Sequence, residues 1–431
     1  MAISQNFPDV RPSLNLNFAR SKTLDPRITF ERASIGTYVD ENGLIKTAAA
    51  DEARFDHDPE TGESLGLLIE EQRTNLITYS DDISSWGASN VTVVSVSVSN
   101  PFGYSSVYRV RGSSSLNRGH SISPGGSVPA NTPHTTSVYV KGEGTGIDAG
   151  KIQLRINGIG YGVGVVNFDL FTNQSNTPEG LSGTSDSSKT WSINDYGMEF
   201  VGDDWYRIWM THQSDNTSSV IVVTITSLSA KDNPSLDRIF WYTAPNTGGF
   251  YIAGAQLESG SFKTSVIPTS GSTITRQPDN ASITGTNFTD FYNATEGSLY
   301  TRFIINGIDP SYNNTSVMIH DNTENNYIAI FGYSPAYAWV QSSGSTSAGL
   351  ALGSPTSTGI DYKVSMGYKL NDFAGSISGL IYTDNSGSIP EVNTMYIGRR
   401  YTLNKSLNGH IKQLRYYPER LTNTQLQNLT K

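Results

Sequence analysis

Apolar and polar residues alternate along much of this chain, the pattern of a β-strand with one buried and one wet face. Residues 94–98 alternate valine with serine, and residues 152–157 alternate isoleucine or leucine with polar side chains. Glycine-rich turns separate such segments, and helical patterns are few. We therefore expect an all-β chain made of β-sandwiches, most naturally of the jelly-roll form.

The spacing of these patterns divides the chain into four parts. Residues 1–80 hold short strands with little apolar content, and we expect a connector that packs on the next domain or on a neighbouring protein. Residues 81–270 are expected to form a first β-sandwich, residues 271–285 a polar hinge, and residues 286–431 a second β-sandwich.

Two local signals predict smaller elements. Asn42-Gly43 suits a type I′ turn and predicts a hairpin. Near the C-terminal end, Thr422 and Gln425 have the spacing of a capping box, and the leucines around them that of a hydrophobic staple. This predicts one short helix after the last strand.

The charge pattern excludes several classes of protein. The net charge is −9, and no run of Lys or Arg occurs, whereas nucleic-acid binders carry basic patches. There are no cysteines, so disulfides and thiolate metal sites are excluded. No apolar stretch reaches the length of a membrane span. The first residues lack the features of a signal peptide, so we expect synthesis in a cytoplasm without export by the usual secretory route.

Two blocks of sequence carry a family resemblance. Residues 24–30 read LDPRITF, residues 68–71 read LIEE, residues 73–76 read RTNL, and residues 251–258 read YIAGAQLE. Together they resemble a family of bacteriophage virion proteins with concanavalin A-like β-sandwich domains. Residues 407–418, followed by the capped helix, resemble the close of laminin-G-like and pentraxin-like domains.

The resemblance implies a structural component of a phage particle, namely a tail fibre, head fibre or capsid decoration protein. Its N-terminal segment would join other virion proteins, and its sandwiches would adhere to host surface glycans, as a homotrimer. The alternatives are a capsid or tail-assembly protein without a host ligand, or a glycan depolymerase.

Aromatic residues are the candidates for glycan contact. Tyr333, Tyr337 and Trp339 lie around a predicted turn that could expose them. Residues 205–209 also carry two tryptophans and a tyrosine, but alternate positions of a strand face opposite ways. At least one of those faces must be core, so we favour the first group.

Two polar loops have the oxygen ligands that calcium needs. The candidate ligands are Asp56, Asp58, Glu60 and Glu63 in one loop, and Asp321 and Asn322 in the other. The alternative in each case is an ordinary turn rich in turn-forming residues. No other cofactor is expected.

No motif for catalysis is present. The chain has no HExxH and no GxSxG. Its six histidines do not cluster in the sequence, and no pair of carboxylates stands out as a glycosidase pair. We therefore expect no catalytic residues and no enzymatic activity.

Overall fold

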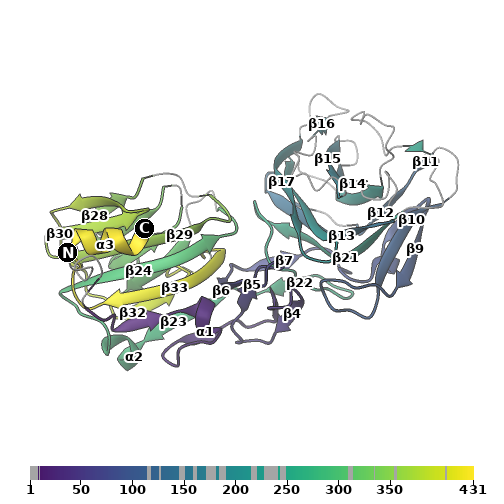
Figure 1. Cartoon of the computed structure of the whole chain (residues 1–431). Helices are drawn as coiled ribbons and strands as arrows, with labels where there is room; N and C mark the ends of the chain where they lie inside the picture. The colour runs from purple at the N-terminus through teal and green to yellow at the C-terminus, as the bar shows by residue number, and fades with distance from the viewer. Residues whose placement is uncertain are drawn as a thin grey trace.

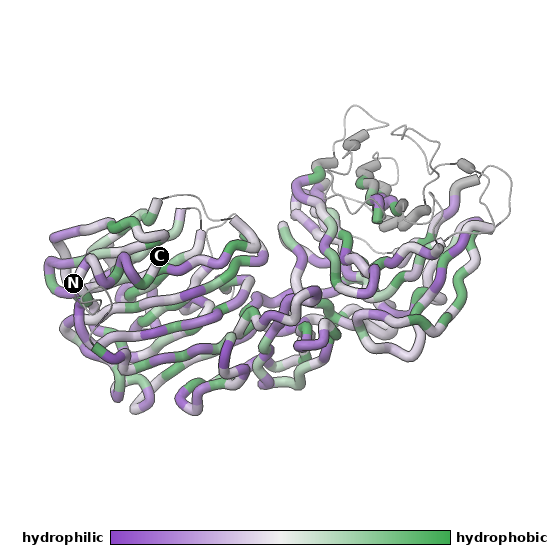
Figure 2. Tube along the Cα trace, in the orientation of Figure 1, coloured by the Kyte–Doolittle hydropathy of each residue, from purple (hydrophilic) through white to green (hydrophobic). Residues whose placement is uncertain are grey.

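The chain folds into two β-sandwiches that lie side by side (Figure 1). The computed structural model describes residues 8, 10–113, 118–125, 128–144, 151–158, 163–170, 181–183, 191–214, 221–227, 241–242, 249–308, 314–333, 335–353, 357–402 and 405–431. The described residues are nearly all strand and turn, so the predicted all-β class is confirmed. Along the strands, hydrophilic and hydrophobic positions alternate (Figure 2).

The second sandwich consists of an eight-stranded and a seven-stranded sheet. The first sheet has the order β31 (Leu380–Asp384), β30 (Asp372–Ile377), β29 (Asp361–Lys369), β24 (Glu296–Ile305), β33 (Gly409–Tyr417), β6 (Ser64–Ile69) and β5 (Phe55–His57), and β1 (Leu14–Leu16) also pairs with β33. The other sheet has the order β2 (Thr29–Glu31), β23 (Asn280–Thr284), β32 (Thr394–Ile397), β25 (Thr315–His320), β26 (Tyr327–Phe331), β27 (Tyr337–Ser342) and β28 (Ser345–Ala351).

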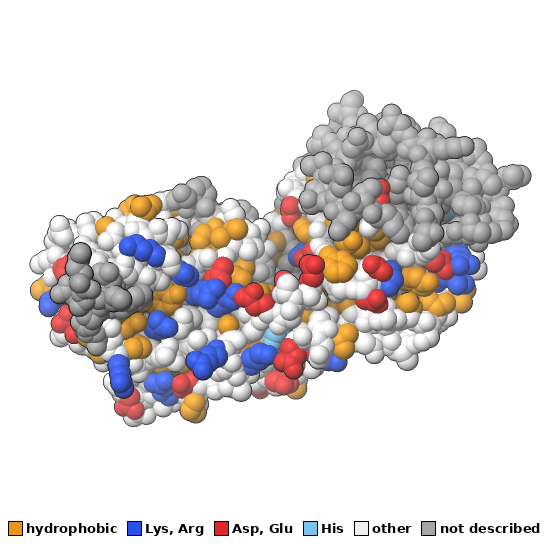
Figure 3. All heavy atoms as spheres, viewed as in Figure 1, with side chains coloured by type: hydrophobic (Ala, Val, Ile, Leu, Met, Phe, Trp, Pro, Cys, Tyr) orange, Lys and Arg blue, Asp and Glu red, His pale blue; other side chains and the backbone are white. Residues whose placement is uncertain are grey.

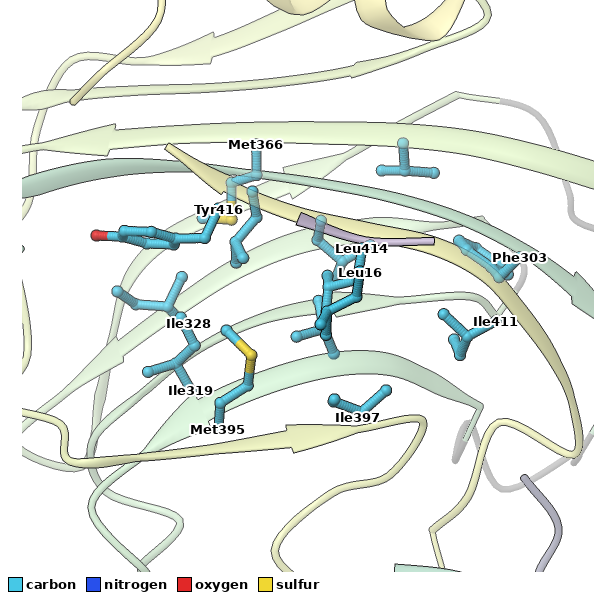
Figure 4. Packing of buried hydrophobic residues seen from close by; sticks show 14 of the residues in the cluster. Leu16, Phe303, Ile319, Ile328, Met366, Met395, Ile397, Ile411, Leu414 and Tyr416 are labelled. Atoms are coloured by element: carbon cyan, nitrogen blue, oxygen red, sulfur yellow. The ribbon is translucent and has the colours of Figure 1, made fainter. Parts of the chain in front are cut away.

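The N-terminal segment completes this second sandwich. Strands β1, β2, β5 and β6 come from residues 14–69, and in Figure 1 the first elements of the chain lie beside the last. Leu16 is buried in the same core as Phe303, Ile397 and Leu414 (Figure 4). The segment expected to pack on the domain that follows it thus packs on the sandwich at the far end of the chain.

The first sandwich consists of two six-stranded sheets. One has the order β17 (Trp191–Phe200), β18 (Trp205–Ser214), β13 (His134–Glu143), β21 (Gly249–Ser259), β10 (Val107–Gly112) and β9 (Val91–Val96). The other has the order β16 (Leu181–Gly183), β15 (Val163–Asp169), β14 (Lys151–Gly158), β19 (Ile221–Ser227), β12 (Ser121–Ser123) and β8 (Gly87–Ser89), and β11 (Arg118–Gly119) pairs separately with β20 (Trp241–Tyr242).

The two alternating segments behave differently in this sandwich. Ile152, Leu154 and Ile156 of β14 are fully buried in the core, as predicted. On β9 the expected buried face is interrupted, because Val94 is 40% exposed while Val93 packs against the core. Since β9 is an edge strand, its outer side has no neighbouring strand to cover it.

Short paired strands join the two sandwiches. Strand β7 (Arg73–Asn75) pairs with β22 (Ile274–Arg276), and β3 (Gly36–Val39) forms a hairpin with β4 (Ile45–Ala48). Residues 271–285, expected as a polar hinge, therefore contain the whole of β22 and β23, both in paired strands. The hairpin at Asn42-Gly43 is confirmed, but of these two residues only Gly43 has a positive φ, of 76°, so the turn is not type I′.

Helices are short and peripheral. Among the described residues they are α1 (Phe18–Ser21), a 3₁₀ turn η2 (Ile83–Ser85), α2 (Gly285–Thr289) and α3 (Asn423–Thr430). The predicted C-terminal helix is confirmed: the Thr422 side chain and Gln425 form a capping box at the start of α3. No helix among the described residues has the length and hydropathy of a membrane-spanning segment.

Candidate functional site

The three aromatic residues selected from the sequence lie together on the outer face of the seven-stranded sheet. Ala338 and Val340 of β27 point into the core, so the alternating Tyr337 and Trp339 point outward. The ring centroids of Tyr337 and Trp339 are 6.0 Å apart, and those of Tyr333 and Tyr337 are 5.7 Å apart. We call this row of half-buried rings, Tyr333, Tyr337 and Trp339, the aromatic shelf.

A glycine allows the indole of Trp339 to lie against the sheet. Trp339 pairs with Gly349 on β28, and a Cβ atom at Gly349 would lie 3.0 Å from Cζ3 of the indole. The indole Nε1–H donates a hydrogen bond of 3.2 Å to Oε1 of Gln341. The ring is therefore held in place while part of it stays exposed.

The inner end of the shelf rests on buried aromatic residues. The rings of Phe331 and Tyr333 stack at 5.2 Å, and the guanidinium of Arg400 lies 5.2 Å from the Phe331 ring centroid. Burial raises the pKa of Tyr333 to about 12, against a smaller opposing effect of Arg400. Tyr333 is therefore a neutral phenol at physiological pH.

A second candidate site is a cavity of about 680 Å³ between the two sandwiches. We call it the interdomain cleft. Residues from β17, β18 and the segment 261–266 line it on one side, residues 306–308 and 358–359 on the other, and residues 56–60 also contribute. In Figure 3 the surface is indented between the two bodies, with acidic side chains nearby.

Trp209 is the aromatic residue of β18 that reaches this cleft. Its indole Nε1–H donates to Oδ2 of Asp195 at 3.1 Å, and Nζ of Lys263 lies 4.5 Å from its ring centroid. Gly197, its partner on β17, has no Cβ, and one built there would lie 2.3 Å from Cζ2 of the ring. Trp209 is half-buried, so it keeps some exposed surface in the cleft.

The other two aromatics of this strand are structural. Trp205 is fully buried and donates from Nε1 to the carbonyl oxygen of Ser99 at 2.8 Å. Tyr206 faces the core of the first sandwich, where its ring lies 5.4 Å from that of Phe200. As expected, Trp205 and Tyr206 take opposite faces of the strand.

Charges in the cleft are arranged in pairs. Nζ of Lys263 lies 2.8 Å from Oε2 of Glu199. Burial acts to raise the pKa of Glu199, but the positive charges of Lys263 and Arg207 outweigh it and hold that pKa below its ordinary value. Arg207 lies 5.4 Å from the ring centroid of Tyr139, and burial raises the pKa of that tyrosine to about 12. Glu199 is therefore a carboxylate at neutral pH.

In the first loop proposed for calcium, the carboxylates have protein partners. Asp56 accepts hydrogen bonds from the backbone N–H of Val39 at 2.5 Å and pairs with Nε2 of His410 at 2.8 Å. Asp58 accepts from the backbone N–H of Thr61 and from its hydroxyl. Glu63 forms an ion pair with Lys412, whereas Glu60 is exposed. The loop is organised as a capped turn.

The second loop proposed for calcium is a hairpin turn between β25 and β26. Oδ2 of Asp321 accepts from Nδ2 of Asn326 at 2.8 Å, and Oδ1 accepts from the backbone N–H of Thr323. Asn322 takes a positive φ of 67°. Within the parts of the chain that the structure describes, no group of three or more His, Asp or Glu side chains is placed to hold a metal ion.

A buried ion-pair network lies where the connecting strands meet. Nη1 of Arg54 lies 2.8 Å, and Nη1 of Arg276 3.0 Å, from Oε2 of Glu70. Asp279 pairs with both Arg32 and Arg54. Burial acts to raise the pKa of Glu70, but Arg276 and Arg54 reverse this and lower it strongly. We call these five residues the buried network; at 4% exposure or less they cannot reach a ligand.

Asn75, from the RTNL block, ties the connector to the first sandwich. Its Nδ2 donates to the carbonyl oxygens of Ala255 and Ile267, and its Oδ1 accepts from the backbone N–H groups of Ile77 and Leu257. All four bonds are 3.1 Å or shorter. Asn75, one of the residues that carry the family resemblance, therefore stabilises the contact between the connector and the first sandwich.

Of the acidic residues that line the cleft, sequence reasoning singled out Asp56, Asp58 and Glu60, as candidate calcium ligands. Asp195, Glu199 and Lys263 are scattered along β17 and the segment after β21, and no motif marks them. Asp203 and Asp204, two adjacent acidic residues, are exposed in the turn between β17 and β18. The pairing of β17 with β18 places Asp195 and Glu199 near Trp209, and Lys263 pairs with Glu199, while the second sandwich adds residues 306–308 and 358–359 to the cleft.

No family model and no curated protein matches the chain. Among solved structures, a heptameric SAP-like pentraxin from Limulus polyphemus matches with 17% identity and a TM-score of 0.26, over 32% of this chain and 70% of its own. Domains LG4-5 of the mouse laminin alpha1 chain match with 9% identity and a TM-score of 0.23, over 69% of this chain and 87% of their own. All these TM-scores are below 0.5, so the fold rests on the strand pairing described above.

The same search returns a sialidase from Trypanosoma rangeli. It matches with 11% identity and a TM-score of 0.23, over 97% of each chain. This match to an enzyme contradicts the expectation that the chain has no enzymatic activity, and that expectation is withdrawn. A likeness at this TM-score assigns no reaction to the chain.

Proposed function

We propose that the chain is a structural protein of a bacteriophage particle whose β-sandwiches adhere to glycans on the host surface. It would be made in the host cytoplasm and carried on the virion as a fibre or decoration protein. The observation that carries the adhesion is the aromatic shelf.

The shelf has the form that sugar recognition uses. Tyr337 and Trp339 present parts of their ring faces on a rigid strand, and apolar faces of pyranose rings pack against such surfaces. Trp339 is fixed by Gln341 and lies across Gly349, so little side-chain freedom is lost when a ligand binds. Polar groups at the rim, such as the Tyr337 hydroxyl, supply hydrogen bonds to sugar hydroxyls.

The proposed place on a phage particle is supported by the resemblance of residues 24–30 and 68–76 to virion proteins. In this chain the same residues hold the two sandwiches together, through Glu70 in the buried network and through Asn75. Paired strands and buried ion pairs hold the two sandwiches in a fixed arrangement, as expected for modules that a particle displays.

Several copies would make weak single contacts sufficient. A single shelf is expected to bind weakly, but copies held on one particle act together through effective concentration. We propose a homotrimer, which sedimentation of the purified protein would detect as a species of three times the chain mass of 46.8 kDa.

Adhesion is tested with purified host surface polysaccharide on a biosensor. The wild-type protein should bind, and Trp339→Ala should bind about tenfold more weakly, a change of about 1.4 kcal/mol. Tyr337→Ser should weaken binding in the same direction. The matched control is Leu380→Ala, which removes a side chain that is 58% exposed on the opposite sheet of the same sandwich.

The other outcomes decide between the alternatives. Absence of binding by the wild type, with the chain located inside the particle by electron microscopy, would establish a purely structural assembly role. Shortening of the polysaccharide during incubation would establish depolymerase activity instead of simple adhesion. Equal binding by wild type and Trp339→Ala would show that the aromatic shelf does not bind the polysaccharide.

A further inference from the structure

The adhesion proposed for the aromatic shelf does not involve the interdomain cleft. Its volume of about 680 Å³ lies within the range of small-molecule sites, roughly 300–1,000 Å³. It is lined by parts of the chain that are far apart in sequence, from Thr37 to His410. The buried network and Asn75 hold these parts together, so the cleft is part of the folded molecule.

The lining combines an aromatic side chain with hydrogen-bond acceptors. Trp209 is held by Asp195 and bordered by Glu199, whose carboxylate oxygens accept hydrogen bonds. Asp195 is exposed and the Glu199 side chain is 40% exposed, so both are accessible from the cleft. An aromatic face flanked by acceptors suits a ligand with apolar ring faces and many hydroxyl donors.

The charge of the lining narrows the class of ligand. Five carboxylates face the cleft, namely Asp56, Asp58, Glu60, Asp195 and Glu199, against two cationic side chains, Arg207 and Lys263; a sixth, Glu70, is compensated by Arg54 and Arg276 in the buried network. Lys263 is paired with Glu199, and the Arg207 guanidinium donates to the carbonyl oxygen of Thr264 at 2.7 Å. A carboxylate-bearing or sulfated sugar would therefore meet like charge, which costs binding free energy at short range.

From this geometry we propose that the interdomain cleft is a second carbohydrate-binding site, which takes neutral oligosaccharides and rejects anionic ones. Trp209 packs against a sugar ring, and Asp195 and Glu199 accept hydrogen bonds from its hydroxyls. Nζ of Lys263 lies 4.5 Å from the indole centroid, so the sugar packs on the part of the ring that Lys263 leaves exposed. The site does not depend on the aromatic shelf, since the two share no residue.

A glycan array printed with neutral oligosaccharides and with sialylated or uronate-containing ones of the same length tests this proposal. The full-length chain is applied as wild type, Trp209→Ala and Trp339→Ala. We expect Trp209→Ala to weaken binding to a subset of neutral glycans about tenfold, or about 1.4 kcal/mol, while Trp339→Ala leaves that subset unchanged. Anionic glycans should show no loss of signal in Trp209→Ala.

The outcomes of this experiment distinguish the two proposed sites. If Trp339→Ala loses binding and Trp209→Ala retains all of it, the cleft proposal is overturned and the shelf stands. If the signal lost in Trp209→Ala comes from anionic glycans, the proposed selectivity is wrong. Should Trp209→Ala unfold, as read by circular dichroism, the exposed Asp195→Ala takes its place, and unchanged binding by that variant overturns the proposal.

Discussion

At the scale of single residues, burial decides which candidates can act. The aromatic residues chosen from the sequence are half-exposed because Tyr337 and Trp339 occupy the outward positions of their strand. The sequence selected these residues because a predicted turn could expose them, whereas the structure places Tyr337 and Trp339 on β27. Asp279 is an inconspicuous aspartate in the sequence, yet it is fully buried against two arginines. No local pattern marks such a residue, because its partners lie more than 200 positions away.

Buried histidines make the stability depend on pH. Burial, with the charge of His134, lowers the pKa of His212 to about 3, against roughly 6.5 in an unfolded chain. As the pH falls below about 6.5 the unfolded state gains a proton first, so the free energy of unfolding decreases towards pH 3, by about 1.4 kcal/mol per pH unit at most. His212→Gln should flatten this slope for the first sandwich.

The matched control is His320→Gln, because burial lowers the pKa of His320 to about 4 in the second sandwich. Hydrogen exchange of strand amides between pH 7 and pH 4.5 follows each sandwich separately. Each variant should reduce the pH dependence of stability only in the sandwich that carries the substitution. A slope in the first sandwich that is the same for wild type and His212→Gln would contradict the argument.

Removing one charge from the buried network should be costly. Asp279→Asn leaves Arg32 and Arg54 without one of their carboxylate partners, and breaking a buried pair in this way costs about 3–5 kcal/mol. Urea unfolding should show a lower midpoint for this variant, whereas the exposed Glu391→Gln should match wild type. Equal midpoints would show that the network contributes nothing to stability.

At the scale of elements, strand type was predictable and strand pairing was not. The period of two identified β14 and the capping box identified α3, because both signals are local. The pairing of β1 with β33 joins residues 400 positions apart, for example Asn15 with Arg415, and nothing near either strand specifies it. The same limit hid the cleft, whose lining comes from segments spread along the chain between residues 37 and 410.

The aromatic shelf depends on a glycine of the neighbouring strand. Gly349→Val should displace the indole of Trp339, because even a single Cβ there would lie 3.0 Å from the ring. We expect the affinity for surface polysaccharide to fall about tenfold, with a thermal midpoint close to that of wild type, since valine favours strands. Ser345→Val, at an exposed position of the same strand, is the control. Full affinity in Gly349→Val would show that the indole position is irrelevant.

At the scale of the whole molecule, the chain closes on itself, because its N-terminal and C-terminal parts form one sandwich. Its first strands complete the sheets of the last sandwich, while the first sandwich lies between them in sequence as an inserted unit. Paired strands and the buried network then join the two bodies. This arrangement makes the interdomain cleft a property of the full chain and of neither sandwich alone.

Deletion of residues 1–31 tests this closure. It removes the buried side chains Leu14, Leu16, Phe18, Ile28 and Phe30 from the core of the second sandwich. At about 1.5–3 kcal/mol for each of the five buried side chains, the loss is comparable to the whole stability of a typical domain, about 5–15 kcal/mol. Calorimetry should show that the second sandwich loses its unfolding transition while the first keeps its own. Deletion of residues 1–9 is the control, and two intact transitions after the longer deletion would contradict the closure.

The most direct measurement is a structure of the chain bound to an oligosaccharide released from the host surface polysaccharide. The account predicts a pyranose ring packed on the exposed face of Trp339, beside Tyr337, with the indole still lying across Gly349. A sugar bound elsewhere on the second sandwich, with the shelf bare at saturating concentration, would contradict it.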